Sequence, residues 1–572
     1  MMTGLLMFFP TYLHAQDGTV GDTDIEVFNI SGSISNEAHG YMTTRDANRR
    51  APLGNVTTAN ASFSVLGFDS GINLRYDTDD SEFRQSVNRI GFRGSWRWVS
   101  LSAGDVTPSW SQHSLSGTRL RGGQLELTPG LFHMEVAIGR SSRAVDPSDD
   151  EALRNVSFNR MLYGARLGYG DTGRSYFKLS GFYAKDDQGS VTIPEEIDEQ
   201  ELFTGRRASP PAENLLISPE FQLSFAGQRV QFGGEGAVSA LTRDLRSGTI
   251  DAGEAGVPEF LTGVMDVRSS TRVGYAGSVF TQLNLDPVDV TLTYERTQPG
   301  FETLGRRSVR DDQQTYSAEV GVALLDRRLQ LTNRISRNED NLLGQRVQTQ
   351  TGLDYDLDAT MDLGQNWSVS GGYGIMRNRT EADDADAEIA TNTHTTQNFR
   401  LQPSLNVMRG DNSHTFSLST HYQTMATDLG GAGGGRSTDG YTLNNTLSYS
   451  VALFDGLSLN AGLNGVVGDT GGSEMRNVGF NAGLGYSFFD GDLTTNLNGG
   501  ASRNRVSRPS PNGEAGEDSA SWQFNGNGRV SYRITAAGSL DFSVRTTNHA
   551  ISTGPGSGFS EFESRLSFNY SF

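Results

Sequence analysis

The sequence of 572 residues contains no cysteine, so it can form neither a disulfide framework nor a cysteine-ligated metal site. Hydrophobic residues make up only 35 % of the chain, and it has no run of about 20 apolar residues, which a membrane-spanning helix requires. Acidic residues outnumber basic ones by 67 to 47, which argues against a nucleic-acid partner. Glycine is abundant, with 69 residues, but it lacks the every-third-residue period of collagen. The sequence is therefore that of an acidic, glycine-rich chain whose composition is uniform along its length.

The first residues have the composition of a targeting segment. The apolar residues 5–9 precede the small-residue site Leu13-His14-Ala15-Gln16, although neither lysine nor arginine stands before them. This pattern predicts a signal peptide over residues 1–15, cleaved between Ala15 and Gln16 after export through the Sec pathway. A short periplasmic segment, residues 16–24, is then expected to lead into the folded part. The alternative is an apolar N-terminus that is not cleaved.

From about residue 25 to Phe572, apolar residues alternate with polar or small ones. The clearest example places these residues on one face of a strand: Tyr441, Leu443, Leu447, Tyr449, Val451 and Leu453. Because neighbouring residues of a strand point to opposite faces, each such segment predicts a strand with one apolar and one polar face. Residues 25–572 are therefore expected to form a single all-β domain.

The connectors between these strands alternate in length. Short turns are expected at 170–173, 226–228, 286–287, 326–328, 363–366, 409–412, 454–456, 489–491 and 535–538. Longer polar segments lie between them, at 189–213, 246–269, 298–311, 380–390, 430–439 and 505–519. The pattern predicts about 26 strands of roughly 9 to 16 residues.

A membrane-spanning sheet must close, because lipid cannot satisfy the polar groups of an open edge. We therefore expect a transmembrane, antiparallel, up-and-down β-barrel with short periplasmic turns and long outer loops. Its place would be the outer membrane of a Gram-negative cell, in contact with lipid and lipopolysaccharide. A soluble propeller or a solenoid is the alternative, but neither a per-blade motif nor a strict short repeat occurs.

The last strand carries a more specific pattern. Leu566, Phe568, Tyr570 and Phe572 fall on one face, and the chain ends on the last of them. This is similar to the C-terminal signal that outer-membrane barrels present to the barrel-assembly machinery. An ordinary final strand that happens to end in phenylalanine is the alternative.

Several segments between residues 85 and 345 carry a family resemblance. Among them are Asn88-Arg89-Ile90-Gly91, Leu115-Ser116-Gly117 with Gly122-Gly123, Thr128-Pro129-Gly130-Leu131, and Pro211-Ala212-Glu213-Asn214-Leu215. In this order and spacing they resemble the large, mostly uncharacterised outer-membrane barrels of the Bacteroidota type. The resemblance implies an outer-membrane barrel and assigns no activity to these positions.

The physical interpretation of these motifs is mainly structural. Pro129-Gly130 has turn chemistry, and Gly117, Gly122 and Gly123 allow a bulge or a close approach of backbones. The segment 211–214 ends a predicted long loop, so it can serve a function or simply join the loop to a strand.

No catalytic or metal-binding motif is found. The eight histidines form no HExxH pair, and neither a nucleophile elbow nor a phosphate-binding loop occurs. Acidic clusters within 146–151, 195–201 and 383–388 lie in predicted outer loops, where solvated charge is favoured over cation binding. We therefore expect a protein that is not an enzyme and has no cofactor, with an outer-membrane hydrolase as a remote alternative.

The expected size of the barrel raises the question of what fills it, since 16–18 strands already leave an aqueous channel. Residues 16–24 offer no room for a plug domain, so inward side chains, folded-in loops or a partner polypeptide must fill the lumen. The loops 189–213 and 246–269 are the expected occluding segments. The preferred hypothesis is a gated or partner-occluded conduit for solutes or an exported polypeptide. The alternative is a scaffold that anchors surface proteins or glycans through its outer loops.

Overall fold

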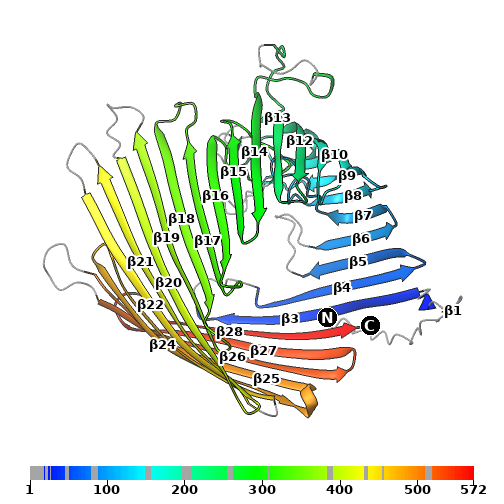
Figure 1. Ribbon diagram of the computed structural model, residues 1–572. Helices are drawn as coiled ribbons and strands as arrows, with labels where there is room; N and C mark the ends of the chain where they lie inside the picture. Colours follow the sequence, from blue (N-terminus) through cyan, green and yellow to red (C-terminus); the bar gives the residue numbers. More distant parts are fainter. Residues whose placement is uncertain are drawn as a thin grey trace.

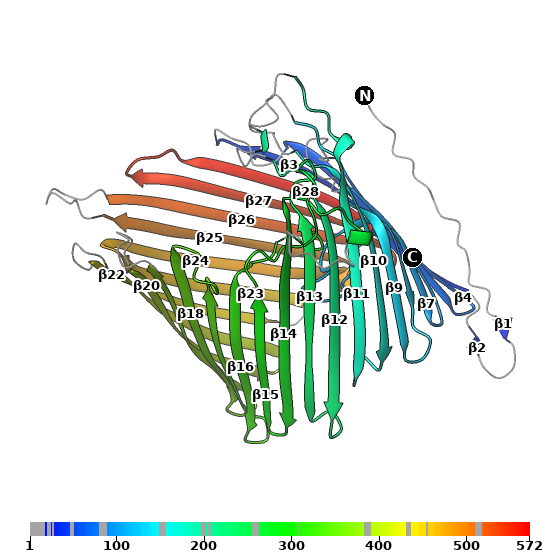
Figure 2. The ribbon, with the colours of Figure 1, turned by 90° about the horizontal axis from the view of Figure 1, so that it is seen from above.

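The computed structural model describes residues 18–19, 24–25, 28–45, 51–78, 88–147, 156–195, 202–203, 208–253, 262–306, 308–382, 391–430, 436–453, 456–508 and 518–572. Within them, 26 strands form one closed antiparallel barrel, as the alternation predicts. Figure 1 shows these strands running from blue to red around a wide ring, and Figure 2 shows the ring from above. No helix in the described residues is long and apolar enough to cross a membrane.

The first half of the barrel consists of β3 (Phe28–Thr43), β4 (Leu53–Val65), β5 (Phe68–Asp77), β6 (Arg89–Trp96), β7 (Val99–Val106), β8 (Leu120–Leu127), β9 (Phe132–Ser142), β10 (Asn159–Gly170), β11 (Tyr176–Asp187), β12 (Glu213–Phe225), β13 (Val230–Thr242), β14 (Thr271–Leu285) and β15 (Val288–Thr297). The second half consists of β16 (Gln313–Leu324), β17 (Leu329–Asp340), β18 (Gln348–Asp362), β19 (Trp367–Ala382), β20 (Thr391–Arg409), β21 (Asn412–Gly430), β22 (Arg436–Ala452), β23 (Leu457–Thr470), β24 (Ser473–Phe488), β25 (Leu493–Ser507), β26 (Asp518–Thr535), β27 (Gly538–Thr553) and β28 (Phe559–Ser571). Two short strands outside the barrel, β1 (Gly18–Thr19) and β2 (Asp24–Ile25), pair with each other. Two short 3-10 helices, η2 (Gln188–Ser190) and η5 (Phe489–Gly491), lie in connectors.

Each strand pairs with its sequence neighbours, and β28 pairs with β3 to close the ring. At this seam the Phe572 amide donates to the Gly32 carbonyl at 2.9 Å, and the Gly32 amide donates back at 2.8 Å. The blue and red strands accordingly lie side by side in both views. Closure satisfies the edge hydrogen bonds that lipid could not.

The apolar face of each strand points outward. On β22, Tyr441 and Leu447 are exposed, as are Phe480 and Leu484 two strands further on. Large apolar side chains of this kind recur around the ring on one parity of each strand, while the other parity faces the lumen. An exposed apolar band on a closed sheet is the arrangement of outer-membrane barrels, where lipid covers it.

The connectors follow the predicted alternation of length. Turns fall where expected, for example at Asp286-Pro287 between β14 and β15 and at residues 410–411 between β20 and β21. The start of β3, the end of β28 and the short turns lie at the same end of the barrel, because β3 and β28 pair antiparallel at the seam. By the usual orientation of outer-membrane barrels, this end is periplasmic.

Some details differ from the sequence-based expectation. Strand lengths run from 8 to 19 residues, and β20 and β21 are the longest. Strand β22 begins at Arg436, inside the predicted loop 430–439, and Gly471-Gly472 forms a tight turn at the outer end. Pairing of Arg436 with Leu429 of β21 extends β22 into the predicted loop. Between β23 and β24, the positive φ angles of the two glycines, +64° and +87°, allow a two-residue reversal.

Candidate functional site

The loop between β7 and β8, residues 107–119, folds inside the barrel. Its Trp110 lies against Gly164 of β10, where a Cβ would come within 2.6 Å of the indole. The hydroxyls of Ser111 and Ser218, on β12, are 3.2 Å apart, and the Gln112 amide donates to Glu235 of β13 at 3.0 Å. The loop therefore crosses the inner faces of successive strands.

His113 joins this loop to two strands at once. Its Nδ1 contacts Oε1 of Glu235, and its Nε2 lies 3.2 Å from Oε1 of Glu295 on β15. Burial lowers the pKa of the ring, but the hydrogen bonds and charges of the two glutamates outweigh it and raise the pKa of His113 to about 9. The imidazole is thus a cation at neutral pH and donates both of its protons to carboxylates. A serine triad needs one ring nitrogen on a hydroxyl, and here neither nitrogen is so placed.

A second network ties the same loop to the wall. Trp110 Nε1 donates to Glu135 of β9 at 2.8 Å, and Arg166 of β10 lies between Glu135 and Glu220 of β12. Glu220 also accepts from the Tyr176 hydroxyl at 2.7 Å. Buried charges of opposite sign, each hydrogen-bonded, hold these strands and the loop in one arrangement.

A second inward loop, residues 298–312, contacts the first loop and packs against the same part of the wall. The Thr118 hydroxyl donates to the Gly305 carbonyl at 2.7 Å, and the Leu304 amide donates to Asn214 Oδ1 at 2.9 Å. The fully buried Phe301 occupies the space over Gly274 of β14, where a Cβ would come within 2.5 Å of the Phe301 backbone. Glycine is therefore required at position 274 for the loop to approach.

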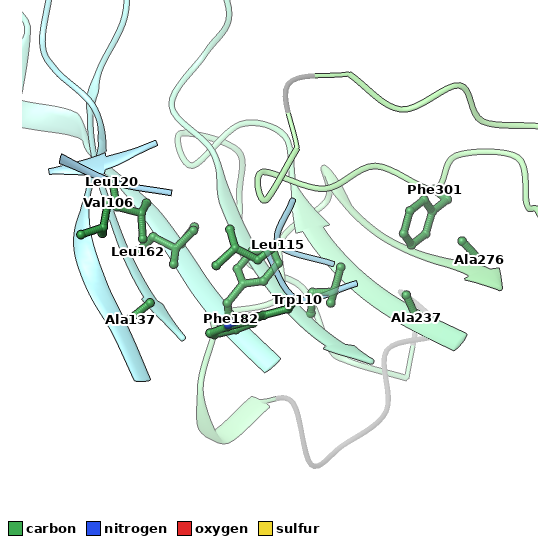
Figure 3. Close-up of a cluster of buried hydrophobic side chains, with 12 residues drawn as sticks. Val106, Trp110, Leu115, Leu120, Ala137, Leu162, Phe182, Ala237, Ala276 and Phe301 are labelled. Atoms are coloured by element: carbon green, nitrogen blue, oxygen red, sulfur yellow. The ribbon is translucent and has the colours of Figure 1, made fainter. Parts of the chain in front are cut away.

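The two loops and the wall enclose an apolar cluster, drawn in Figure 3. Its members include Leu115, Leu162, Phe182 and Phe301, each almost completely buried. Burying a side chain of this size stabilises a protein by about 1.5–3 kcal/mol. The β9–β15 side of the lumen is therefore a packed core rather than an open surface.

The opposite side of the lumen is lined differently. The inward side chains of β22–β25 in the described residues are mostly small or polar, apart from Val466, Met475 and Val506, and carboxamides recur among them. They include Asn444, Asn460, Asn464, Asn477, Asn481, Asn496, Asn498 and Asn504. We call this surface the amide wall.

Glycines on the neighbouring strands make room for these amides. Gly462 pairs with Asn481, and a Cβ at Gly462 would come within 2.5 Å of the Asn481 Oδ1. Gly483 pairs with both Asn460 and Asn498, and a Cβ there would come within 2.6 Å of Asn460 Nδ2. The amides therefore lie flat across the neighbouring backbone, which leaves the lumen wide.

Most motif positions in the first half are structural. Asn88 Oδ1 accepts from the Asp77 amide at 2.6 Å, Arg89 begins β6, and Gly117 lies in the inward loop with φ +71°. Gly122 packs on the next strand so closely that a Cβ would come within 2.5 Å of the Gly139 Cα, whereas Gly123 has ordinary spacing.

Pro129 and Gly130 lie in the periplasmic turn between β8 and β9, where Gly130 has φ +67°. This is the left-handed region that glycine adopts without strain.

The Pro211–Asn214 motif lies at the outer start of β12. Asn214 faces inward and is fully buried, with its amide donating to Ser239 at 2.8 Å and to the Ala240 carbonyl at 2.9 Å. Glu213 points to the opposite face and contacts the hydroxyl of Tyr183 and, at 3.4 Å, Lys185 Nζ. The motif thus anchors the inner loop on one side and ties β11 to β12 on the other.

The predicted occluding loop 246–269 does not pack on the inner face in its described part. Met265 and Val267 are buried against Ala240, with Leu215 and Tyr183 beside them, and these strand residues have the outward parity. The local sequence does not show which of the two loops, 246–269 or 107–119, enters the lumen, because both are polar connectors between strands.

The C-terminal residues lie along β28 with their side chains outward. Leu566, Phe568 and Phe572 are exposed, and the rings of Tyr570 and Phe572 stack with centroids 6.1 Å apart. The predicted cleavage site at Ala15 and Gln16 lies outside the described residues. The described ranges hold no group of three or more histidine, aspartate or glutamate side chains arranged for a metal ion.

Sequence reasoning missed the contacts of His113, Trp110 and Glu235. The partners of His113 are 122 and 182 residues away in the chain, so no local spacing reveals them. The one available signal is the run Leu115-Ser116-Gly117, whose apolar leucine is unusual for an outer loop.

No family model matches this chain, and no curated protein matches it. Among solved structures, Acinetobacter baumannii OccAB4 is 12 % identical, with a TM-score of 0.27 over 70 % of this chain and 98 % of that one. Pseudomonas aeruginosa OpdK, solved with vanillate, is 13 % identical, with a TM-score of 0.27 over 64 % and 93 %. The FrpB iron transporter of Neisseria meningitidis is 11 % identical, with a TM-score of 0.31 over 83 % and 87 %. At such TM-scores these likenesses carry no argument, so the function is argued from this chain's own geometry.

Proposed function

We propose that this protein is a non-enzymatic outer-membrane conduit for solutes, narrowed on one side by its own loops. The observation that carries the proposal is the asymmetry of the lumen. Loops 107–119 and 298–312 are packed against β9–β15, whereas the amide wall on β22–β25 carries no such cover in the described residues. A polar inner surface on a barrel of this circumference supports a water-filled route.

The clamp at His113 supports gating rather than permanent closure. Three charged side chains hold the loop, with Glu235 nearly buried and Glu295 about one-third exposed. The hydrogen bonds of this one side chain, which we call the latch, can break while the wall stays intact, because backbone hydrogen bonds between β13, β14 and β15 hold the wall together. Loosening the latch is expected to widen the route.

The proposal is tested by inserting the purified protein into planar bilayers. We expect steady ionic conductance from the unaltered chain, and larger conductance when residues 108–118 are replaced by a short Gly-Ser link. Each sample is checked for folding by its change in gel migration on boiling, so that failure to fold is not counted as failure to conduct.

Two results would contradict the conduit. One is a folded, inserted protein that never conducts, even with the inward loop removed. The other is purification in mild detergent with one stoichiometric protein partner in the lumen and no conductance, which would favour the scaffold or a partner-occluded barrel.

Export and assembly belong to the same proposal. We infer removal of residues 1–15 after Sec export, and recognition of Leu566, Phe568, Tyr570 and Phe572 by the barrel-assembly machinery. Mass measurement of the mature chain tests the first point, since cleavage after Ala15 leaves Gln16 at the N-terminus.

A further inference from the structure

Six carboxamides surround one open hollow of about 710 Å³ on the inner face of the barrel. They are Asn464, Asn477, Asn481, Asn498, Asn525 and Asn527. Tyr41 of β3 and Glu561 and Glu563 of β28 line the same hollow, although β23 and β3 are several strands apart around the ring. The sheet therefore curves sharply here, as Figure 1 shows where β24–β27 turn under β28 and β3. We call this hollow the amide corner.

Two amides of the corner belong to a cross-strand chain of hydrogen bonds. Asn464 Nδ2 donates to Asn477 Oδ1 at 3.0 Å, and Asn477 Nδ2 contacts Asn504 Oδ1. This cross-strand chain fixes which edges Asn464 and Asn477 turn toward the lumen. Fixed donors and acceptors cost a ligand less entropy than freely rotating ones.

The rim of the corner is acidic but already engaged. The Tyr41 hydroxyl donates to Glu561 Oε1 at 3.0 Å, and Arg45 lies 2.7 Å from the same oxygen. Arg565 donates to Glu563 at 2.7 Å. These carboxylates therefore have partners for part of their charge and keep further lone pairs to accept hydrogen bonds.

The chemistry of the corner points to one ligand class. Each carboxamide offers both a donor and an acceptor, and a hydroxyl group offers both as well, so the two satisfy each other. The amides offer an ion no opposite charge to replace its hydration shell. Of the charged groups that line the hollow, Glu561 and Glu563 already have arginine partners, and Arg545 of β27 carries the opposite sign. Selectivity of a pore rests on such lining donors and acceptors.

We infer that the amide corner binds neutral, hydroxyl-rich solutes of the saccharide class on their way through the lumen. This inference rests on the proposed conduit, which it deepens by naming the substrate class and the residues that hold it. Asn481 and Asn498 on adjacent strands β24 and β25 form the centre of the site, and Asn525 and Asn527 of β26 extend it.

The test uses maltohexaose as a neutral probe in two measurements. In planar bilayers, the saccharide is expected to interrupt the current in a concentration-dependent manner. In detergent, isothermal titration calorimetry measures its binding whether or not the protein conducts. The double variant Asn481→Leu with Asn498→Leu is expected to weaken binding about tenfold, because it removes hydrogen bonds of ordinary strength.

Asn60→Leu provides the matched control, since Asn60 on β4 has the inward parity but does not line the corner. The near-isosteric pair N481D/N498D serves if the leucine variant does not fold, and it too is expected to weaken maltohexaose binding. Binding that is equal in the wild type and in the folded corner variant would overturn the inference, as would equal interruption by polyethylene glycol of the same size. A protein that binds maltohexaose but never conducts overturns the conduit and leaves the binding site standing.

Discussion

The imidazole Nε2 of His113 lies 3.2 Å from Oε1 of Glu295, and the other ring nitrogen contacts Glu235. This one side chain bridges its loop to two strands of the barrel wall, β13 and β15. The ring is about 1 % exposed, so it is shielded from bulk solvent, and of its two partners Glu235 is nearly buried while Glu295 is partly exposed. The charge of this single group therefore supports two of the contacts that position the inward loop.

Replacing this group tests the latch. His113→Ala is expected to increase conductance and to lower the free energy of unfolding by about 2–3 kcal/mol, because it removes two hydrogen bonds to charged groups. Urea unfolding in detergent and single-channel recording measure the two effects. His133→Ala is the control, since His133 faces the lumen near the periplasmic end and bonds to the Gly170 carbonyl instead. Equal effects of the two substitutions would show that the latch has no special role.

The latch is expected to weaken at alkaline pH. The pKa of His113 is about 9 in the folded protein against an ordinary value near 6.5, so the folded state binds its proton more tightly than the unfolded state does. The resulting stability is fully present below about pH 6.5 and is lost as the pH rises through about 9. Conductance of the wild type should therefore rise between about pH 8 and pH 10, whereas that of His113→Gln should change little in this window.

Substitutions at two adjacent glycines of β8 test how closely the strands of the barrel wall pack. An alanine Cβ at Gly122 would come within 2.5 Å of the Gly139 Cα, whereas at Gly123 the nearest atom, the Ser102 carbonyl oxygen, is 3.4 Å away. Gly122→Ala should therefore cost about 1–3 kcal/mol or more by overpacking, and Gly123→Ala much less. Urea midpoints and the folded fraction on unboiled gels measure the difference. Similar losses from both would mean that β8 and β9 are not in such close contact.

The seam residue Phe572 tests the assembly proposal. Its ring lies over Gly32, where a Cβ would come within 2.5 Å of Phe572 Cζ. Phe572→Ala should reduce the amount of folded protein in the outer membrane, while Phe524→Ala, an outward ring of similar exposure on β26, should reduce it less. Quantifying folded protein in membrane fractions distinguishes them, and an equal reduction would refute a special role for the last residue.

The barrel itself is visible in the sequence, because strand alternation is local. The strand from Tyr441 to Val451 and the turn at Asp286-Pro287 can each be predicted from a few neighbouring residues, and both lie where the sequence predicts them. The inner loops are different, because what holds them is far away in the chain. His113 finds Glu235 only once seven strands have paired, and Asn481 finds Gly462 only across a register that no motif encodes. Composition showed that asparagine and glycine are present, but their cross-strand complementarity exists only in the folded sheet.

The most direct test of the account places one thiol on each side of the lumen, which the absence of cysteine makes unambiguous. Asn498→Cys lies on the amide wall, and Ser218→Cys lies buried beneath the loop 107–119. Single-channel current is recorded while a charged methanethiosulfonate reagent is added. The account predicts a stepwise fall in current for Asn498→Cys and no change for Ser218→Cys. An unchanged current through a labelled Asn498→Cys protein, or a fall with Ser218→Cys, would contradict it.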